Sequence, residues 1–210
     1  VGSEMCIRDR DIRVILIKIA DRLHNMRTME YMVAQKQLEK SLETMEIYAP
    51  IAHRLGLQKV KWELEDLSLK YLDPDGYREI ITYLDSKADV LNEFMSDVKK
   101  KITDRLTEYS IHATVQSRIK HTYSIYRKMF IQGKSMDEIY DIYAVRVIVD
   151  TVEDCYNVLG IVHDMFRPLP NRFKDYISTP KPNMYQSLHT TVIGKEEIPF
   201  EVQILSLIHI

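Results

Sequence analysis

The chain has 210 residues, 45% of them hydrophobic, which is enough for one domain of ordinary size or two small ones. Its 29 Lys and Arg nearly balance 31 Asp and Glu, so the net charge of −2 argues against binding of nucleic acid or anionic lipid over the whole surface. Only two cysteines are present, and no apolar run approaches the ~20 residues that cross a membrane. We therefore expect a cytoplasmic globular protein with neither a membrane nor a nucleic acid as its direct partner.

The first helix is predicted from Asp11 to Arg27. Its apolar residues recur at steps of four and three, which indicates one buried stripe: Ile12, Leu16, Ile19, Leu23 and Met26. Residues 1–10 and 206–210 lack the periodicity and the motifs of the sequence that they adjoin. We expect both segments to be non-native flanking sequence outside the fold.

Three further helical patterns follow. The second helix runs through Leu38 to Tyr48, Pro50 is expected to kink it, and Gly56 suits the left-handed residue after its end. A third pattern spans Val60 to Tyr71 and stops at the turn 73–76. A long helix is then predicted from about Tyr77 to Tyr109, with apolar positions at Ile80, Leu84, Leu91, Met95, Val98, Ile102 and Leu106. The first half is therefore predicted to be all helical.

The pattern changes near Ser110, where β-branched residues begin to alternate with polar ones. Strands are predicted at about 111–118, 142–149, 188–194 and 199–204. Helices are predicted at 121–132, at a capping box from Ser135 to Glu138, and at 152–166 with Asp150 or Thr151 as its cap. The second half is therefore α+β or mixed α/β.

A loop from Arg167 to Gln186 contains four prolines and cannot be regular structure throughout. It combines cations that suit phosphates, aromatic rings that suit a base, and amides that suit base edges. These are Arg172, Lys174 and Lys181, then Phe173, Tyr176 and Tyr185, then Asn183 and Gln186. The composition fits a nucleotide site, and it fits a solvated, proline-stiffened surface loop as well.

A second group of cations surrounds the start of the helix near His121, where free backbone N–H groups favour an anion. Its members are Arg118, Lys120, Ser124 and Lys128. They could form a phosphate cradle or be ordinary solvated charges.

The strand at 199–204 places Glu201 and Gln203 on one face, and His189 and Thr191 can share that face through the adjoining hairpin. Asp141 opens another strand, so two carboxylates could converge on a Mg²⁺ ion held between phosphates. Solvent-facing strand charges are the alternative. In the helical half, Asp21, Asn25 and Thr28 share a polar face that suits either one metal ligand or solvent.

Several of these motifs, in this order and spacing, closely resemble the long RelA/SpoT family of bacterial (p)ppGpp synthetase/hydrolases. The resemblance covers about residues 11–204. It is carried by the runs Ala20–Thr28, Arg118–Lys120, Tyr123–Met129, Arg172–Ile177, Pro180–Asn183, Tyr185–Thr191 and Glu201–Ile204.

The resemblance implies an α+β fold in two parts. Residues 11–75 would be the last helices of an HD-type hydrolase domain and a connecting helical bundle. Residues 76–205 would be a synthetase domain, truncated at its C-terminal end, with a mixed, nucleotidyltransferase-like sheet and flanking helices. The regulatory region that couples such proteins to ribosomes would be missing.

The implied activity is transfer of the β,γ-pyrophosphoryl group of ATP to the 3′-hydroxyl of GDP or GTP, which makes the alarmones of the stringent response. Asp141 and Glu201 would be the catalytic acids and Mg²⁺ ligands. The donor side would comprise Arg118, Lys120, Ser124, Lys128, Arg172 and Lys174. The acceptor side would comprise Lys181, Asn183, Tyr185, His189 and Gln203, with Tyr185 stacked on guanine.

The charges of Arg172 to Asp175 are typical of the family's bifunctional members. Asp21 matches one ligand of the family's Mn²⁺ site, and Asn25 and Thr28 match pocket residues, but the other ligands should precede residue 11, so this site is expected to be incomplete. Asn171 replaces a usual glycine, a change that left-handed backbone tolerates. Two alternatives are a longer parent protein that acts mainly as a Mn²⁺-dependent hydrolase and a guanine-nucleotide-binding module without catalysis.

Overall fold

A computed structural model describes residues 11–181, 184–194 and 197–209. These form two compact units. One contains the described residues up to Thr82 together with His121–Tyr126, and the other contains Tyr83–Lys120 and the described residues from Arg127 onward. The division falls inside a long helix, seven residues beyond the boundary that the sequence predicts at 75/76.

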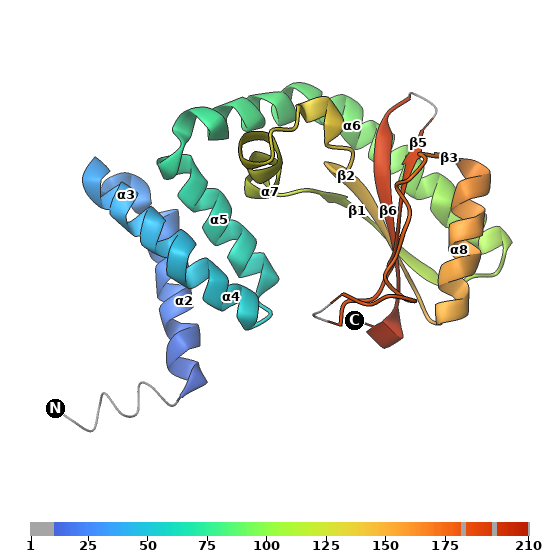
Figure 1. Ribbon diagram of the computed structural model, residues 1–210, viewed down its shortest axis with the longest axis horizontal. Helices are drawn as coiled ribbons and strands as arrows, with labels where there is room; N and C mark the ends of the chain where they lie inside the picture. Colours follow the sequence, from blue (N-terminus) through green and yellow to red (C-terminus); the bar gives the residue numbers. More distant parts are fainter. Residues whose placement is uncertain (1–10, 182–183, 195–196, 210) are drawn as a thin grey trace. The chain divides into compact units, whose positions relative to one another are not determined.

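The first unit is helical, as predicted. It contains α2 (Ile12–Arg27), a 3₁₀ turn (Met29–Tyr31), α3 (Ala34–Glu43), a π turn (Thr44–Tyr48), α4 (Ala49–Arg54), α5 (Gln58–Leu72), α7 (Thr122–Tyr126) and residues 74–82 of the long helix described below (Figure 1). Its core is built from Ile19, Met26, Met29, Ala49, Ala52 and Leu64.

The predicted buried stripe of α2 is only half correct. Ile19 and Met26 are 2% and 1% exposed, but Ile12 and Leu16 are 56% and 41% exposed. Among the described residues, the core cluster reaches only the part of α2 from Ile19 onward. Periodicity marks the apolar side of a helix, but tertiary contacts decide how much of it is covered.

Local backbone signals fix the helix ends. Gly56 has φ +74°, and Leu57 N–H donates to the Ala52 carbonyl at 2.9 Å, which closes the helix end as predicted. Pro50 lies in the first turn of α4, directly after the π turn. The missing N–H of proline interrupts the regular ladder, so the expected kink takes the form of a π turn.

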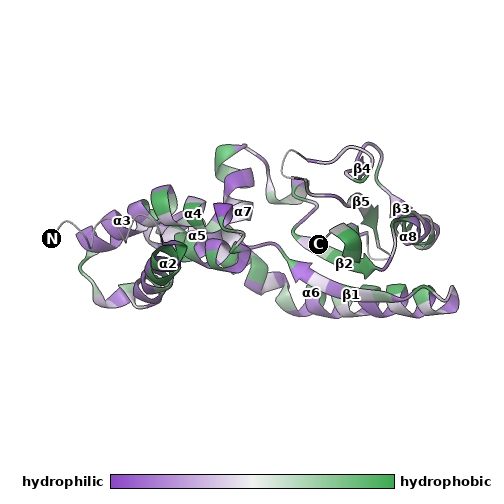
Figure 2. Cartoon of the chain, turned by 90° about the horizontal axis from the view of Figure 1, so that it is seen from below, coloured by the Kyte–Doolittle hydropathy of each residue, from purple (hydrophilic) through white to green (hydrophobic). Residues whose placement is uncertain are grey.

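The long helix α6 (Pro74–Glu108) begins three residues earlier than predicted. Pro74 is tolerated in a first helical turn, and the Asp73 carboxylate accepts the Gly76 N–H at 3.0 Å. Residues 73–76 therefore both follow the end of α5 and form the start of α6. Polar and apolar bands alternate along α6 (Figure 2). Of its predicted apolar positions, all but the half-buried Leu84 are buried: Ile80, Leu91, Met95, Val98, Ile102 and Leu106.

The second unit is built on a mixed sheet. Its strands are β1 (Ala113–Ile119), β2 (Tyr143–Val149), β5 (Leu188–Ile193) and β6 (Pro199–Ser206), with the short strands β3 (Arg167–Pro168) and β4 (Lys174–Asp175). The order is β1-β2-β6-β5-β3, with β4 on β5; β2 and β6 are parallel and the other pairs antiparallel. The α+β class is confirmed. Strand β6 runs two residues beyond its predicted end, and Ser206 pairs with Val149.

The predicted helix at 121–132 is shorter than expected. It consists of α7, which ends at Tyr126, and a π turn from Arg127 to Ile131. The capping box at Ser135 is present and opens a 3₁₀ turn from Met136 to Glu138. At the start of α8 (Val152–Met165), the Thr151 hydroxyl accepts the Asp154 N–H at 3.1 Å, so Thr151 is the cap.

One face of the sheet is apolar. Phe200 of β6 is fully buried and makes edge contacts with Phe94 of α6 and with Phe166 at the end of α8. Both helices therefore cover the same face (Figure 1). Side chains that alternate with Phe200 and Val202 point to the other face. None of the described helices is long and apolar enough to cross a bilayer.

Candidate functional site

The sheet face opposite α6 and α8 carries several of the predicted site residues. Glu201 pairs with Ala144 of β2, which in turn pairs with Arg118 of β1. One step along, Gln203 pairs with Arg146 on one side and with His189 on the other. Directly opposed residues in a sheet share a face. Arg118, Arg146, His189, Glu201 and Gln203 therefore all belong to the face opposite α6 and α8.

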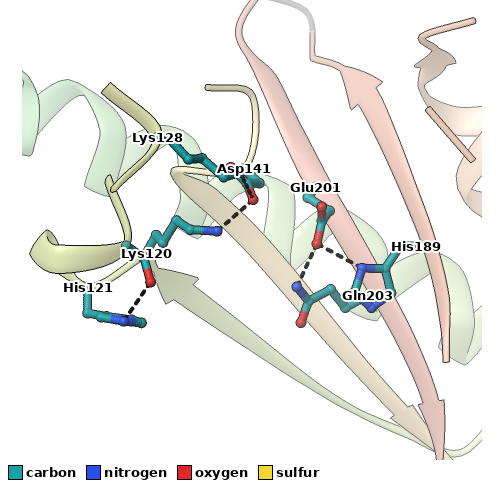
Figure 3. Close-up of polar contacts among 8 residues, drawn as sticks. Lys120, His121, Lys128, Asp141, His189, Glu201 and Gln203 are labelled. Atoms are coloured by element: carbon teal, nitrogen blue, oxygen red, sulfur yellow. Dashed lines mark hydrogen bonds and ion pairs between the residues drawn. The ribbon is translucent and has the colours of Figure 1, made fainter. Parts of the chain in front are cut away.

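Glu201 lies at the centre of this polar face (Figure 3). Its Oε1 accepts a hydrogen bond from Gln203 Nε2 at 2.6 Å and lies 3.1 Å from His189 Nδ1. Its side chain is 17% exposed. Burial alone would raise the pKa of Glu201, but the hydrogen bond and charge of His189, aided by Gln203, hold it below the ordinary value. Glu201 is thus a fixed, ionised carboxylate near neutral pH.

His189 connects Glu201 to the aromatic part of the site. Its Nε2 lies 3.2 Å from the Tyr185 hydroxyl, while its Nδ1 faces the Glu201 carboxylate. An ionised carboxylate only accepts, so in the neutral imidazole Nδ1 carries the proton and Nε2 accepts from Tyr185. This hydrogen-bonded row fixes the orientation of Glu201.

Asp141 forms a second acidic centre in the turn before β2. Both of its oxygens lie within 2.7 Å of Lys128 Nζ, and Oδ2 lies 2.6 Å from Lys120 Nζ. Burial opposes ionisation, but the two ammonium groups lower the pKa of Asp141. Burial lowers the pKa of Lys120, and Lys128 adds to that effect, while Asp141 opposes it. The predicted pair of acids is close enough for the charge of Asp141 to raise the pKa of Glu201.

The aromatic residues of the predicted loop gather beside His189. The Tyr185 and Tyr176 rings meet the His189 ring edge to face, with centroids 5.9 Å and 5.3 Å away. Lys181 Nζ lies 4.4 Å from the Tyr176 centroid and 5.1 Å from the Tyr185 centroid. Tyr185 is half-buried and lies next to the Tyr176 ring, the His189 ring and the Lys181 ammonium group. A cation and a flat ring are therefore presented together.

The remaining loop residues are placed less closely. Lys174 pairs with His189 across β4 and β5 and is exposed. The Arg172 guanidinium lies 4.9 Å from the Tyr140 ring centroid. Asn171 has φ +60°, the left-handed backbone expected at this position. Asn183 lies outside the described residues.

The predicted cradle of cations is only partly assembled. Lys120 and Lys128 meet at Asp141, and Arg118 lies on the polar face of the sheet. Ser124, however, belongs to the first compact unit, where its hydroxyl lies 2.6 Å from His121 Nε2. The sequence spacing that grouped Ser124 with the lysines does not reveal this division.

Sequence reasoning gave two residues of this region no role. The side chain of Arg146 belongs to the polar face, and its Nε is buried without a hydrogen-bond partner among the described residues. Burial lowers the pKa of Arg118, and the charge of Arg146 lowers it further. Asp175 accepts the N–H groups of Ile177 and Ser178 at 2.9 Å each and so organises the loop. An arginine within an otherwise apolar strand was the available signal for Arg146.

The predicted hydrolase residues lie in the first unit. Asn25 Nδ2 donates to Asp21 Oδ2 at 3.2 Å, and the Thr28 hydroxyl donates to the His24 carbonyl at 3.1 Å. Within the described part of the chain, no three His, Cys, Asp or Glu residues are grouped as metal ligands.

The open sheet face thus defines a class of protein: one that presents fixed carboxylates among arginines, lysines and aromatic rings, an arrangement suited to a phosphorylated ligand. Residues 117–208 match the region found in RelA / SpoT proteins, and residues 8–58 match the HD domain. The chain belongs to the RelA/SpoT family. The two matches extend into residues 8–10 and 206–208, which had been assigned to flanking sequence.

Curated relatives support this assignment. The chain is 53% identical over 195 residues to a GTP pyrophosphokinase of Streptomyces coelicolor and 49% identical to the bifunctional (p)ppGpp synthase/hydrolase RelA of Mycobacterium tuberculosis. It is 52% identical to a probable guanosine-3′,5′-bis(diphosphate) 3′-pyrophosphohydrolase of Synechocystis. Each match covers 93% of this chain but only 23%, 26% and 26% of the relative. The chain spans about a quarter of their length.

Solved structures that resemble the chain include two bacterial proteins. The small alarmone synthetase 2 of Bacillus subtilis matches 57% of this chain and 71% of its own, with 30% identity and a TM-score of 0.47. A GTP pyrophosphokinase family protein of Streptococcus pneumoniae matches 61% of this chain and 70% of its own, with 26% identity and a TM-score of 0.48.

Proposed function

We propose that the sheet domain transfers the β,γ-pyrophosphoryl group of ATP to the 3′-hydroxyl of GDP or GTP, in the cytoplasm. The observation that carries this proposal is a pair of acidic centres, one on the polar face of the sheet and one in the turn before β2. One is a carboxylate held ready to accept a proton, Glu201; the other is a carboxylate that gathers two ammonium groups, Asp141. The names of the curated relatives support the same reaction.

The proposed step is an in-line displacement. Glu201 accepts the proton of the ribose 3′-hydroxyl, and the freed oxygen forms a bond to the β-phosphorus of ATP. The bond between that phosphorus and the oxygen bridging to the α-phosphate breaks, so AMP leaves. Phosphoryl transfer depends mainly on positioning and charge neutralisation, which a fixed base and a set of cations supply.

The donor side would use Arg118, Lys120 and Lys128 together with Arg146, and Arg172 and Lys174 as predicted from the sequence. Ser124 stays a sequence-based proposal. On the acceptor side, Tyr185 would stack on the guanine ring and Lys181 would meet an acceptor phosphate. His189 and Gln203 hold Glu201, and Asn183 stays a sequence-based proposal. These roles match the chemistry of each side chain: guanidinium and ammonium for phosphate, ring for base.

The carboxylates also fit a Mg²⁺ ion. Mg²⁺ prefers one or two carboxylates together with substrate phosphates, and the charge of Asp141 acts on the pKa of Glu201. Asp141, with Glu201 nearby, would hold the ion. Bound Mg²⁺ would neutralise charge on the triphosphate. Lys120 and Lys128 already neutralise Asp141, so they would turn toward phosphate oxygens when the metal enters.

The direct test is a reaction of this chain with ATP, GDP or GTP and MgCl₂, resolved by anion-exchange chromatography. Equal amounts of AMP and a guanosine nucleotide with two added phosphates are expected, and chelation of the metal should stop both. Production of ADP, or of free pyrophosphate alone, would contradict the proposal. Nucleotide binding without AMP would favour a binding module without catalysis.

We propose removal of the 3′-pyrophosphate as a second activity of the longer relatives, carried by the HD region. The match at residues 8–58 and the pyrophosphohydrolase name of the Synechocystis relative favour it. Asp21 would be one Mn²⁺ ligand and Asn25 and Thr28 would line the pocket. Mn²⁺-dependent hydrolysis of ppGpp by a longer relative is the test, and replacement of the residue that matches Asp21 should abolish it.

A further inference from the structure

The short helix α7 is held against α5 at its start. The Asp66 carboxylate of α5 accepts the Tyr123 N–H at 2.7 Å. The His121 ring stacks on the Trp62 ring of α5, with centroids 5.1 Å apart and planes at 26°. Asp66 thus acts as an N-terminal cap supplied by another helix, a contact that satisfies one of the free N–H groups of a helix start.

The other end of α7 is also fixed to the first unit. The Tyr126 hydroxyl donates to Asp73 Oδ2 at 2.9 Å, and the other oxygen of Asp73 caps α6. Ile125 is fully buried, and Thr122 is 8% exposed. Both ends and the inner side of α7 are therefore immobilised by residues of α5 and the turn after it.

The segment His121–Tyr126 is flanked by two lysines that belong to the second unit. Lys120 directly precedes His121, and Lys128 is the second residue after Tyr126. Both belong to the second unit, where their ammonium groups share Asp141. Because neighbouring Cα atoms are only 3.8 Å apart, a change in the conformation of residues 121–127 also changes the backbone conformation at both lysines.

We infer that Asp66 is a positioning residue for the phosphate-binding lysines: by capping α7 it fixes the conformation of the segment that joins Lys120 to Lys128, the two lysines that share Asp141. This inference rests on the proposed function for the role of the lysines. The contacts of Asp66 with Tyr123 and of Tyr126 with Asp73 are all made within the first unit, so Asp66 acts on the lysines through α7.

The chemistry of Asp66 supports this role. Burial raises the pKa of Asp66, and the charge of neighbouring Glu65 raises it further, while the N–H groups of Tyr123 and Thr122 oppose the rise. A partly buried carboxylate is costly unless it is hydrogen-bonded, and here its described hydrogen bonds go to the start of α7. An apolar residue at position 66 would be buried at less cost but could not accept the Tyr123 N–H at the start of α7.

Three variants separate this role from general stability. Asp66→Ala removes the cap. Asp66→Asn keeps an oxygen that can accept the Tyr123 N–H, so this variant should retain the cap. Glu63→Ala is the matched control, because Glu63 lies on the same helix and pairs with Arg27 of α2 at 2.9 Å, away from α7.

The first measurement does not depend on catalysis. Limited acetylation followed by mass spectrometry reports how readily each lysine amine reacts, and the exposed Lys36 serves as an internal reference. Asp66→Ala should raise the rates of Lys120 and Lys128 about tenfold, the factor that a lost charge-assisted hydrogen bond corresponds to. Amide exchange at Tyr123 should accelerate in parallel. Asp66→Asn and Glu63→Ala should keep the wild-type lysine rates.

The second measurement uses the proposed reaction. If Lys120 and Lys128 bind the donor, Asp66→Ala should raise the KM for ATP while the KM for GDP stays constant, with recovery in Asp66→Asn. Absence of transfer in the wild-type chain would refute the proposed function, yet the acetylation result would still decide the positioning role.

Unchanged acetylation of both lysines in folded Asp66→Ala would overturn the inference, whether or not Tyr123 exchange accelerates. Should Asp66→Ala not fold, Tyr126→Phe supplies the same test, because it removes only the hydroxyl that reaches Asp73. A smaller rise in the reactivity of both lysines is then expected. Lysine rates equal to wild type in that variant would also overturn the inference.

Discussion

His189 Nδ1 lies 3.1 Å from Glu201 Oε1, so strands β5 and β6 hold an imidazole and a carboxylate in direct contact on one sheet face. The same imidazole reaches the Tyr185 hydroxyl with its other nitrogen. The proposed base is thereby linked to the ring proposed to bind guanine. Placement of the acceptor nucleotide and orientation of the base therefore depend on the same side chain.

Replacement of Glu201 by Gln should remove the base but keep the size and most hydrogen bonds of the side chain. We expect AMP formation to fall by about 10²–10⁴-fold, the range typical of a lost general base. Nucleotide affinity, measured by isothermal titration calorimetry, should change little. A variant that turns over at the wild-type rate would show that another group takes the proton.

Replacement of His189 by Ala should change the pH dependence of the reaction. His189 lowers the pKa of Glu201 against the effect of burial, so its loss raises that pKa. A base works only when deprotonated, and activity falls as the pH drops through its pKa in the folded protein. The acidic limb of the pH–rate profile should therefore move to higher pH.

Gln203→Ala is the comparison for this profile. Gln203 also donates to Glu201 but carries no charge, so its loss should move the limb less. An acidic limb that stays in place in both variants would mean that Glu201 does not control it.

Replacement of Asp141 by Asn should destabilise the fold at neutral pH by about 1–3 kcal/mol, because two partly buried ammonium groups lose their counter-charge. The pKa of Asp141 is lowered in the folded state, so its ionisation stabilises the fold above the unfolded pKa. That contribution disappears as the pH falls through the pKa of Asp141 in the folded state. The difference in free energy of unfolding between the wild type and Asp141→Asn should therefore narrow at low pH.

Urea unfolding at a series of pH values measures this difference. Asp75→Asn is the control, because the Asp75 side chain is 91% exposed and its ion pair is with the nearby, exposed Arg78. It should leave the midpoint unchanged. An Asp141→Asn midpoint equal to that of the wild type at neutral pH would mean that the lysine pair contributes nothing to stability.

Tyr185 offers a test of stacking against hydrogen bonding. Tyr185→Phe keeps the ring and removes only the hydroxyl that meets His189, so the KM for GDP should change about two- to fivefold at most. Tyr185→Ala removes the ring and should raise that KM by about ten- to a hundredfold, as expected for a lost base stack. Equal effects in the two variants would assign the contribution of Tyr185 to its hydroxyl.

Gly56 has φ +74°, and a Cβ added there would meet no atom within 4 Å. Gly56→Ala should therefore destabilise the fold by about 1 kcal/mol through backbone strain alone. Gly160 lies inside α8, with equal space and no positive φ, and Gly160→Ala should stabilise by up to about 1 kcal/mol. Thermal unfolding of both variants gives the comparison; destabilisation in both would point to packing instead.

The sequence determined the features that local chemistry controls. The left-handed end at Gly56, the capping box at Ser135 and the cap at Thr151 depend on a few neighbouring residues, and all three are confirmed. Alternating side chains in β6 likewise placed Glu201 and Gln203 on one face. The ordered motifs predicted the family, which the comparisons confirmed.

Tertiary structure decided which of these residues meet. Asp141 is 13 and 21 positions away from Lys128 and Lys120, a separation that no local period encodes. Ser124, which sequence spacing grouped with those lysines, packs with the first unit through α7. Ile12 carries the same apolar signal as Met26 but is exposed, because the described core covers only the later turns of α2. Backbone sterics act over a few residues, whereas strand register, shared ion pairs and burial require segments that are distant in the chain to come together.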